Sequence, residues 1–117
     1  MGDLHPNSKI WIYSDSREGV FGDGKLRLLK EIDRQGSLSE AAQVLGISYR
    51  KAWGDVRKAE ACLQMSLIEK SRGGKGGGQS CLTPKGRELI KCYTKFQAAV
   101  RNSLQRAYEK HMAEITK

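Results

Sequence analysis

The stretch SLSEAAQVLGISYRKAWGDVRKAEACL, residues 37–63, carries two helix signals in close succession. Ser37 and Glu40 have the spacing of a capping box, in which a serine hydroxyl and a glutamate side chain each satisfy a backbone N–H at a helix start. Gly46 can take the left-handed conformation that ends a helix, and Ser48 is a favourable N-cap for the next one. Because a single residue separates the two, the helices must cross steeply. The stretch therefore predicts a tight helix-turn-helix at about 37–63.

The second of these helices has two chemically different faces when its residues are placed on a helical projection. The apolar face is made by Ala52, Val56, Ala59 and Leu63, with Trp53 at its margin. The opposite, cationic face is made by Arg50, Gly54, Arg57 and Lys58, with Lys51 to one side. Glycine weakens a helix by about 1 kcal/mol relative to alanine, so Gly54 in the centre of the cationic face indicates that a partner approaches the backbone there.

Two short strands and a glycine-rich tip follow the helix-turn-helix. SLIEKS at 66–71 and SCLT at 80–83 are apolar enough to form strands, and SRGGKGGGQS at 71–80 lies between them. We expect a hairpin with the glycines at its tip. Thr83 and Pro84 are then typical of an N-cap and the first residue of a helix.

The C-terminal helix is predicted to run over about 84–114. Its apolar residues recur mostly at steps of three and four, at Leu89, Tyr93, Phe96, Val100, Leu104 and Tyr108 or His111. The C-terminal half has a longer apolar stripe than one small core can cover, so we expect a second copy of the chain to cover it. The expected dimer contacts are Phe96, Val100, Leu104 and Tyr108.

On the N-terminal side the sequence predicts a strand, a loop and a first helix. KIWIYSD at 9–15 combines β-branched and aromatic residues in near alternation, and the glycines of SREGVFGDG at 16–24 indicate a loop. Helical spacing begins at Lys25 and ends at Gly36, a plausible helix stop. The apolar residues of this helix are Leu26, Leu28, Leu29 and Ile32.

The order strand, helix, helix-turn-helix, hairpin, long helix is that of a winged helix-turn-helix. We therefore expect one mainly α domain over 1–117 with a small β-wing at about 67–83. In this fold the second helix of the pair enters the DNA major groove, and the wing lies over adjacent phosphates or the minor groove. The wing residues Arg72 and Lys75 would neutralise phosphate charge, while the glycines around them permit close approach.

The charge of the chain favours a polyanionic partner. The sequence has 21 Lys and Arg against 13 Asp and Glu, a net charge of +8. Residues 50–101 hold 12 basic and 4 acidic side chains, whereas residues 1–49 hold 6 and 7. Since a binding field needs charges concentrated on one surface, a polyanion such as nucleic acid is the natural partner, although a basic face is also a common solubility device.

Two alternatives remain open at this point. A non-specific DNA- or RNA-binding protein would use the same charge, although no stacking platform is apparent among the aromatic residues. A winged helix that binds only protein would not need the positive charge of residues 50–101.

Enzyme chemistry is not expected. GVFGDGK at 19–25 matches the phosphate-binding loop G-x-x-x-x-G-K, but Leu26 stands where a magnesium-binding Ser or Thr belongs. His5 and His111 belong to no Ser-His-Asp or Cys-His arrangement.

No metal, cofactor or membrane segment is expected either. The cysteines are Cys62, Cys81 and Cys92. Their spacing is typical neither of a zinc site nor of a disulfide framework. Free thiols suit a reducing cytoplasm. No apolar run has the length of a membrane span, and the N-terminus lacks the regions of a signal peptide. We expect a cytoplasmic protein.

The sequence also resembles the DNA-binding N-terminal domain of ModE-type molybdate-responsive regulators, whose winged helix is related to that of LysR-type regulators. The resemblance covers about residues 8–100. It rests on GSLS at 36–39 with Ala42, GISY at 46–49 followed by Ala52-Trp53, GGKGGG at 73–78, and LTP at 82–84 with Gly86.

This resemblance implies a cytoplasmic, homodimeric transcription factor that binds a pseudo-palindromic duplex. The implied groove residues are Ser48, Tyr49, Arg50 and Lys51, and the implied wing contacts are Lys75 with Gly74 and Gly76. The chain departs from the family pattern at Lys51, Gly54 and Asp55, so the operator of that family is not implied. Full-length members append molybdate-binding domains, whereas this chain ends at Lys117. We expect the stand-alone form, which does not bind molybdate itself.

Overall fold

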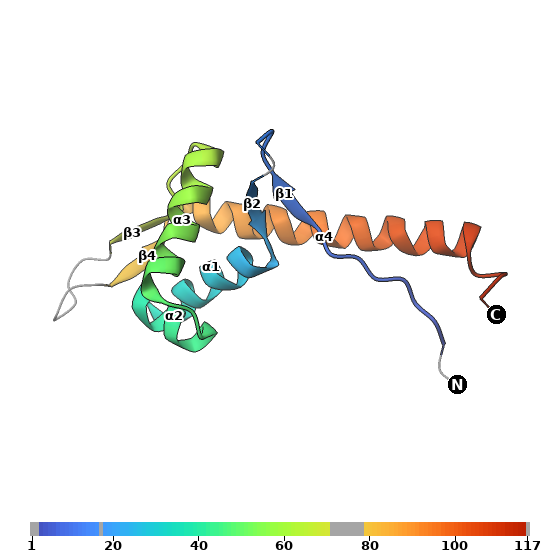
Figure 1. The fold of residues 1–117 in the computed structure, drawn as a ribbon, viewed down its shortest axis with the longest axis horizontal. Coiled ribbons are helices and arrows are strands. Elements are labelled where there is room, and N and C mark those ends of the chain that lie inside the picture. The colour runs from blue at the N-terminus through green and yellow to red at the C-terminus, as the bar shows by residue number, and fades with distance from the viewer. Residues whose placement is uncertain (1–2, 17, 71–78, 117) are drawn as a thin grey trace. The chain divides into compact units, whose positions relative to one another are not determined.

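The computed structural model describes residues 3–16, 18–70 and 79–116. Along these residues the elements are β1 (Trp11–Tyr13), β2 (Gly19–Gly22), α1 (Asp23–Gln35), α2 (Leu38–Leu45), α3 (Tyr49–Leu63), β3 (Ile68–Lys70), β4 (Ser80–Leu82) and α4 (Pro84–His111) (Figure 1). The expectation of a mainly α fold with a small β-hairpin is confirmed.

The chain divides into two compact units. The helix-turn-helix unit contains Trp11–Ile90, and the terminal unit contains Met1–Ile10 together with Lys91–Lys117. The expectation of one domain over 1–117 stays a prediction, because a compact unit need not be one that folds alone.

The N-terminal part of the helix-turn-helix unit differs from the sequence prediction. Residues 16–24 are not a loop throughout, because β2 pairs antiparallel with β1, with Ile12 opposite Phe21. The glycines indicated a loop, but Val20 and Phe21 between them are buried and draw the segment into the core. The strand predicted at 9–15 is also shorter, at Trp11–Tyr13.

Helix α1 begins at Asp23, two residues earlier than predicted. An acidic residue in the first turn is favourable at the positive end of the helix dipole. The helix ends at Gly36, which has φ +78 and is therefore in the left-handed conformation expected of a helix stop.

The helix ends predicted in residues 37–63 are confirmed, although of the two bonds of the capping box only the one accepted by Ser37 is formed among the described residues. Ser37 caps α2 by accepting from the backbone N–H of Glu40 at 3.0 Å, and Ser48 caps α3 by accepting from the N–H of Lys51 at 3.0 Å. Gly46 between the helices has φ +70. These bonds place α3 immediately after a tight turn.

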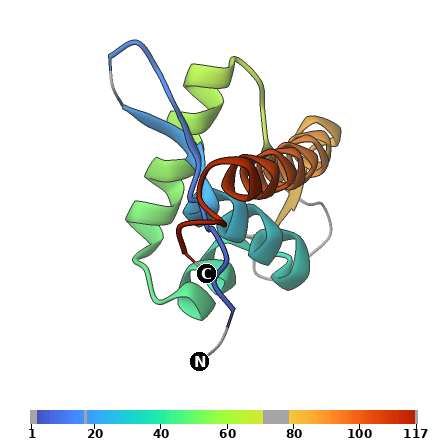
Figure 2. The same cartoon turned by 90° about the vertical axis from the view of Figure 1, so that its right-hand side faces the viewer.

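The core of the helix-turn-helix unit lies among its helices and β2. The buried residues of α3 are Ala52, Val56 and Ala59, as the apolar face predicted, and Leu63 is half-buried. The four predicted apolar residues of α1 are also buried. Both β2 and α1 contact α3, and β2 lies beside α3 in both ribbon views (Figures 1 and 2).

Strands β3 and β4 form the base of the predicted wing and are anchored to the core. They pair antiparallel, with Ile68 opposite Leu82. The Ser80 N–H donates to the Gly36 carbonyl at 2.9 Å, and the Thr83 N–H donates to the Leu67 carbonyl at 3.0 Å. The base of the hairpin is therefore held by the turn between α1 and α2 as well as by its own ladder.

Helix α4 starts where the sequence predicted and ends three residues earlier. The Thr83 hydroxyl accepts from the N–H of Gly86 at 2.9 Å and donates to the Ser66 carbonyl at 2.6 Å, so the predicted N-cap is confirmed. Residues 112–116 form turns in place of the predicted helix, and the Thr116 hydroxyl bonds the Met112 carbonyl there.

Candidate nucleic-acid interface

Helix α3 presents the predicted cationic face to solvent. Tyr49 at its start is 57% exposed. The other exposed residues of this face are Ser48, Arg50, Lys51, Gly54, Arg57 and Lys58. The structure thus brings all the predicted recognition-helix residues together on one element, opposite the side that packs on the core.

The cations of this face differ in their partners. Lys51 pairs with Asp55 at 3.3 Å, Arg57 with Glu60 at 3.3 Å, and Lys58 with Glu18 at 3.7 Å. Exposed pairs such as Lys58–Glu18 contribute only about 0–1 kcal/mol, so a phosphate oxygen can replace that carboxylate at little cost, whereas the Glu60 side chain is only 11% exposed.

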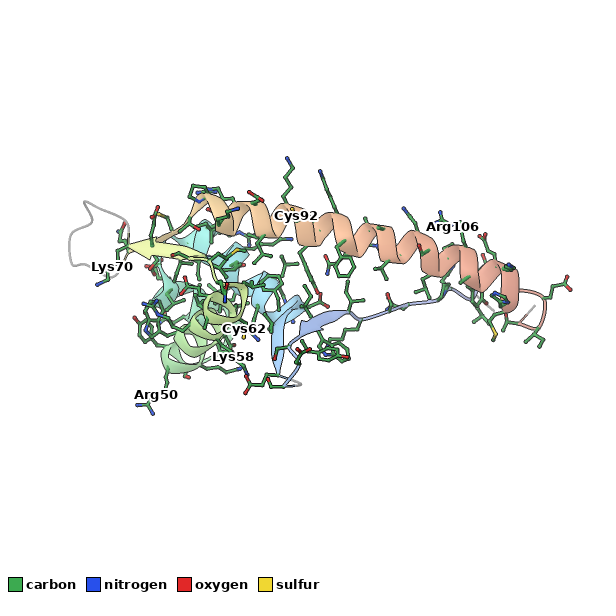
Figure 3. The ribbon with its side chains drawn as sticks, turned by 90° about the horizontal axis from the view of Figure 1, so that it is seen from above. Arg50, Lys58, Cys62, Lys70, Cys92 and Arg106 are labelled. Carbon is green, nitrogen blue, oxygen red and sulfur yellow. The ribbon has the colours of Figure 1, made fainter. Side chains whose placement is uncertain are left out.

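Arg50 differs from these three. It has no ion pair with any residue that the structure describes, and its side chain extends away from α3 in Figure 3. A guanidinium that is exposed and unpaired is ready to donate to a base edge or a phosphate.

Arg57 lies over an aromatic ring. Its guanidinium carbon is 4.3 Å from the centroid of the Trp53 ring, and Glu60 holds it from the other side along the helix. The sequence placed Trp53 at the margin of the apolar face and did not anticipate this stack, although an aromatic residue four positions before an arginine is a recognisable helical pair.

A groove of about 330 Å³ separates α3 from the hairpin. Tyr49, Trp53 and Arg57 line it from α3, and Lys70 and Ser80 line it from β3 and β4. The groove therefore brings aromatic and cationic groups of α3 beside the base of the wing.

Gly54 lies in the middle of the exposed face with free space around it. A Cβ added there would meet nothing within 4 Å. Packing inside the protein therefore does not require glycine at this position.

Glu60 is a structural residue that the sequence prediction missed. Its Oε2 accepts from the backbone N–H of Leu67 at 2.8 Å and of Ile68 at 3.4 Å, while its Oε1 contacts Arg57. No local sequence signal identifies a carboxylate that binds N–H groups seven and eight residues away. Glu60 links the cationic face of α3 to the start of β3.

The remaining predicted contacts lie elsewhere. The wing residues Arg72, Gly74, Lys75 and Gly76 fall outside the described residues. The expected dimer residues belong to α4 in the terminal unit, where Phe96 is 46% exposed and Val100, Leu104 and Tyr108 are half-buried.

Among residues 3–16, 18–70 and 79–116, no cluster of three or more His, Cys, Asp or Glu side chains has the arrangement of a metal site. Over the same ranges, no helix combines the length and apolarity needed to cross a membrane. The three cysteines are free thiols, with Cys62 and Cys92 exposed.

Curated relatives are about 37–38% identical to this chain over the residues that align. The transcriptional regulator ModE of Yersinia pestis is 38% identical over 78 residues, which are 66% of this chain and 30% of that protein. The molybdenum-pterin-binding protein MopB of Rhodobacter capsulatus is 37% identical over 91 residues, 78% of this chain and 33% of that protein. The chain thus spans about a third of the length of these relatives, and the resemblance to ModE-type proteins is confirmed.

Solved structures with the same fold are DNA complexes of LysR-type domains. The CbnR DNA-binding domain bound to DNA has a TM-score of 0.56 and 20% identity, and covers 74% of this chain and 94% of its own. The BenM DNA-binding domain on its benA site has a TM-score of 0.52 and 21% identity, with the same coverage. These likenesses establish the winged helix-turn-helix fold. Residues 24–87 match the model for bacterial regulatory helix-turn-helix proteins of the lysR family, so the chain belongs to that family.

Proposed function

We propose that this chain is a sequence-specific DNA-binding transcriptional regulator of the ModE-like type, which binds a pseudo-palindromic operator as a homodimer. The exposed face of α3 carries the proposal, because Arg50 is unpaired among the described residues and Gly54 leaves the helix backbone open beside it. The names of its relatives support it, since they include transcriptional regulators. We also propose that the protein acts in the cytoplasm and is not an enzyme.

In this proposal α3 enters the major groove, where some of its residues contact base edges and others contact phosphates. Arg50 and Tyr49 reach base edges, where an arginine can donate two hydrogen bonds to guanine. Lys51, Arg57 and Lys58 exchange their carboxylate partners for phosphates. Arg72 and Lys75, with Gly74 and Gly76, contact the flanking backbone from the wing.

The test is selection of bound duplexes from a random pool, followed by anisotropy titrations of the winner, a scrambled duplex and an RNA hairpin across a salt series. An inverted repeat bound about a thousandfold more tightly than scrambled DNA is expected. Equal affinity for all three nucleic acids would instead identify a non-specific nucleic-acid binder. No binding at physiological salt would favour a protein-interaction module.

Arg50→Ala tests base reading directly. It should weaken binding to the selected duplex about tenfold to a hundredfold, with a smaller effect on scrambled DNA, because one bidentate base contact is worth about 1–3 kcal/mol. Lys75→Ala should weaken binding to the selected and the scrambled duplex alike, and should reduce the slope of log affinity against log salt concentration by about one. Arg34→Ala is the matched control, since Arg34 is an exposed arginine of α1. Equal losses of both affinities for Arg50→Ala would remove Arg50 from base reading.

A further inference from the structure

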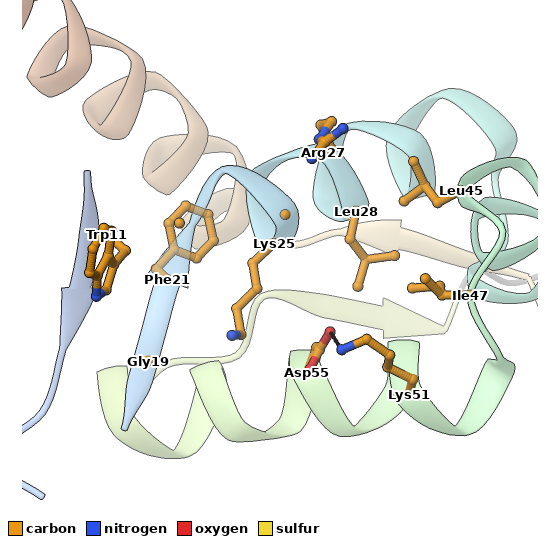
Figure 4. A pocket seen from close by; sticks show the side chains of 12 residues that line it. Trp11, Gly19, Phe21, Lys25, Arg27, Leu28, Leu45, Ile47, Lys51 and Asp55 are labelled. Carbon is orange, nitrogen blue, oxygen red and sulfur yellow. Dashed lines mark hydrogen bonds and ion pairs between the residues drawn. The ribbon is translucent and has the colours of Figure 1, made fainter. Parts of the chain in front are cut away.

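A second hollow lies beside the recognition helix, and of the proposed DNA-contacting residues only Lys51 lines it. This open cavity of about 400 Å³ is lined by the β1–β2 hairpin, the start of α1, the turn before α3, and α3 itself (Figure 4). We call it the hairpin cavity. Its lining residue from the turn is Ile47, and those from α3 are Lys51 and Asp55. All of its lining residues belong to the helix-turn-helix unit.

One side of the hairpin cavity is aromatic. Trp11 of β1 and Phe21 of β2 stand next to each other along it, followed by Leu28 from α1 (Figure 4). Phe21 is buried, but Trp11 is 60% exposed. An indole left in water beside an apolar hollow is a favourable surface for a planar ring, because stacking would remove apolar area from both partners.

The hairpin cavity also contains a cation without a carboxylate. The Lys25 side chain extends from α1 toward α3 and ends between Phe21 and Asp55 in Figure 4. Lys25 is half-buried and makes no ion pair with any residue in the described part of the chain. Asp55 is the one carboxylate among the lining residues, and Lys51 pairs with it at 3.3 Å. An incoming anion would therefore find Lys25 available.

We propose that the hairpin cavity binds a small aromatic carboxylate, with its ring against Trp11 and Phe21 and its carboxylate on the Lys25 ammonium. The apolar side distinguishes this ligand from inorganic phosphate, which would leave the aromatic surface uncovered. Lys25 and the exposed Arg27 are the lining cations without an ion pair among the described residues, and the Lys25 ammonium can pair with one carboxylate. The volume holds about 13 water-sized units, taking about 30 Å³ for each. That matches a bicyclic acid such as indole-3-carboxylate.

The site is independent of the proposed function and is tested without DNA. Indole-3-carboxylate is titrated into ¹⁵N-labelled protein and followed in two-dimensional NMR spectra, with indole-3-carboxamide as the uncharged control and acetate as the ring-free one. The carboxylate should shift the indole N–H of Trp11 and the amides of Gly22 and Gly24, with a Kd of about 1 mM or tighter. The amide and acetate should each bind at least about tenfold more weakly.

Matched variants assign the two ends of the ligand. Lys25→Met and Trp11→Ala should each weaken the binding of indole-3-carboxylate about tenfold or more. Lys30→Met and Tyr13→Ala are the controls, because they change the same helix and the same strand at exposed positions that do not line the hairpin cavity. Spectra of each variant without ligand establish that it is folded.

Three results would overturn the proposal. The first is no saturable shift below about 10 mM, which is too weak for a site of this size. The second is equal affinity for the carboxylate and the carboxamide, and the third is unchanged affinity in Lys25→Met. If Lys25→Met weakens the binding of duplex DNA but leaves the affinity for the carboxylate unchanged, Lys25 contacts the DNA backbone and the proposed ligand site is wrong.

Discussion

Gly54 and Gly86 are both helical residues, yet the structure gives them different reasons for lacking a side chain. Space beside Gly54 is open to at least 4 Å, whereas a Cβ on Gly86 would overlap the carbonyl oxygen of Leu67. Helix propensity alone favours alanine at either position by about 1 kcal/mol. The surroundings therefore decide whether a substitution by alanine raises or lowers the free energy of unfolding.

Gly54→Ala should stabilise the free protein and weaken DNA binding. The free energy of unfolding should rise by about 0.5–1 kcal/mol in urea denaturation, since nothing obstructs the methyl group. Affinity for the selected duplex should fall about tenfold, because the methyl group holds the helix backbone away from the DNA. Ala61→Gly is the control at an exposed position of α3 and should destabilise the fold without changing affinity. An unchanged affinity in Gly54→Ala would refute close backbone approach.

Gly86→Ala should destabilise the protein by about 1–3 kcal/mol, the usual effect of overpacking a well-filled site. Gly86 is buried in the first turn of α4, and the atoms in its way are backbone atoms of Leu67, which cannot rotate aside. The measurement is the urea midpoint at an unchanged m-value. A gain in stability at Gly86, like that expected at Gly54, would mean that α4 and the residue before β3 are not packed this closely.

At the scale of elements, a single carboxylate joins α3 to the wing. Glu60→Ala would leave the N–H groups of Leu67 and Ile68 without their acceptor, so the free energy of unfolding should fall by about 1–3 kcal/mol. Hydrogen exchange at these two amides should quicken by more than exchange at the α3 amides. Glu60→Gln keeps one acceptor oxygen and should restore part of the loss.

The control for Glu60 is an exposed carboxylate. Glu88→Ala removes a side chain that pairs only with Lys85 at 3.9 Å among the described residues, and should change stability by no more than about 0.5 kcal/mol. If exchange at Leu67 and Ile68 is the same in Glu60→Ala as in the wild type, the carboxylate does not hold the hairpin.

The elements that the sequence predicted well are those in which local signals agree. Ser37, Gly46 and Ser48 fix their helix ends through bonds that span three or four residues, so a short window contains the whole interaction. Strand β2 was missed because its pairing with β1 and the burial of Phe21 depend on residues distant in sequence. The glycines of this segment are a local signal, and they indicated a loop. The same holds within the candidate site. Helical projection placed Arg50 and Gly54 on the exposed face, but the link from Glu60 to Leu67 depends on tertiary structure.

At the scale of the whole molecule, the question is what covers the apolar stripe of α4. Phe96 is 46% exposed and packs edge-on against Tyr93 with ring centroids 6.1 Å apart. Part of the terminal unit does cover the helix, since Tyr93 donates to the Ile10 carbonyl and the Tyr108 hydroxyl bonds Thr116. Val100 and Leu104 between them are only half-buried. An operator with two half-sites needs two recognition helices, and this stripe is our proposed dimer contact.

Leu104→Glu should convert the dimer to a monomer in sedimentation velocity at about 10 μM, because burying an unpaired carboxylate in an apolar contact is costly. Asn102→Glu adds the same charge at an exposed position on the opposite side of α4 and should leave the dimer intact. The monomer should bind one half-site with unchanged affinity and lose most of its preference for the full operator, since two linked half-site contacts gain about a hundredfold or more from their effective concentration. A wild-type protein that sediments as a monomer at this concentration would contradict the contact directly. If a Leu104→Glu monomer still binds the full operator as tightly as the wild type, dimerisation through α4 does not contribute to operator binding. The proposed role of α3 as the recognition helix would be unaffected by that result.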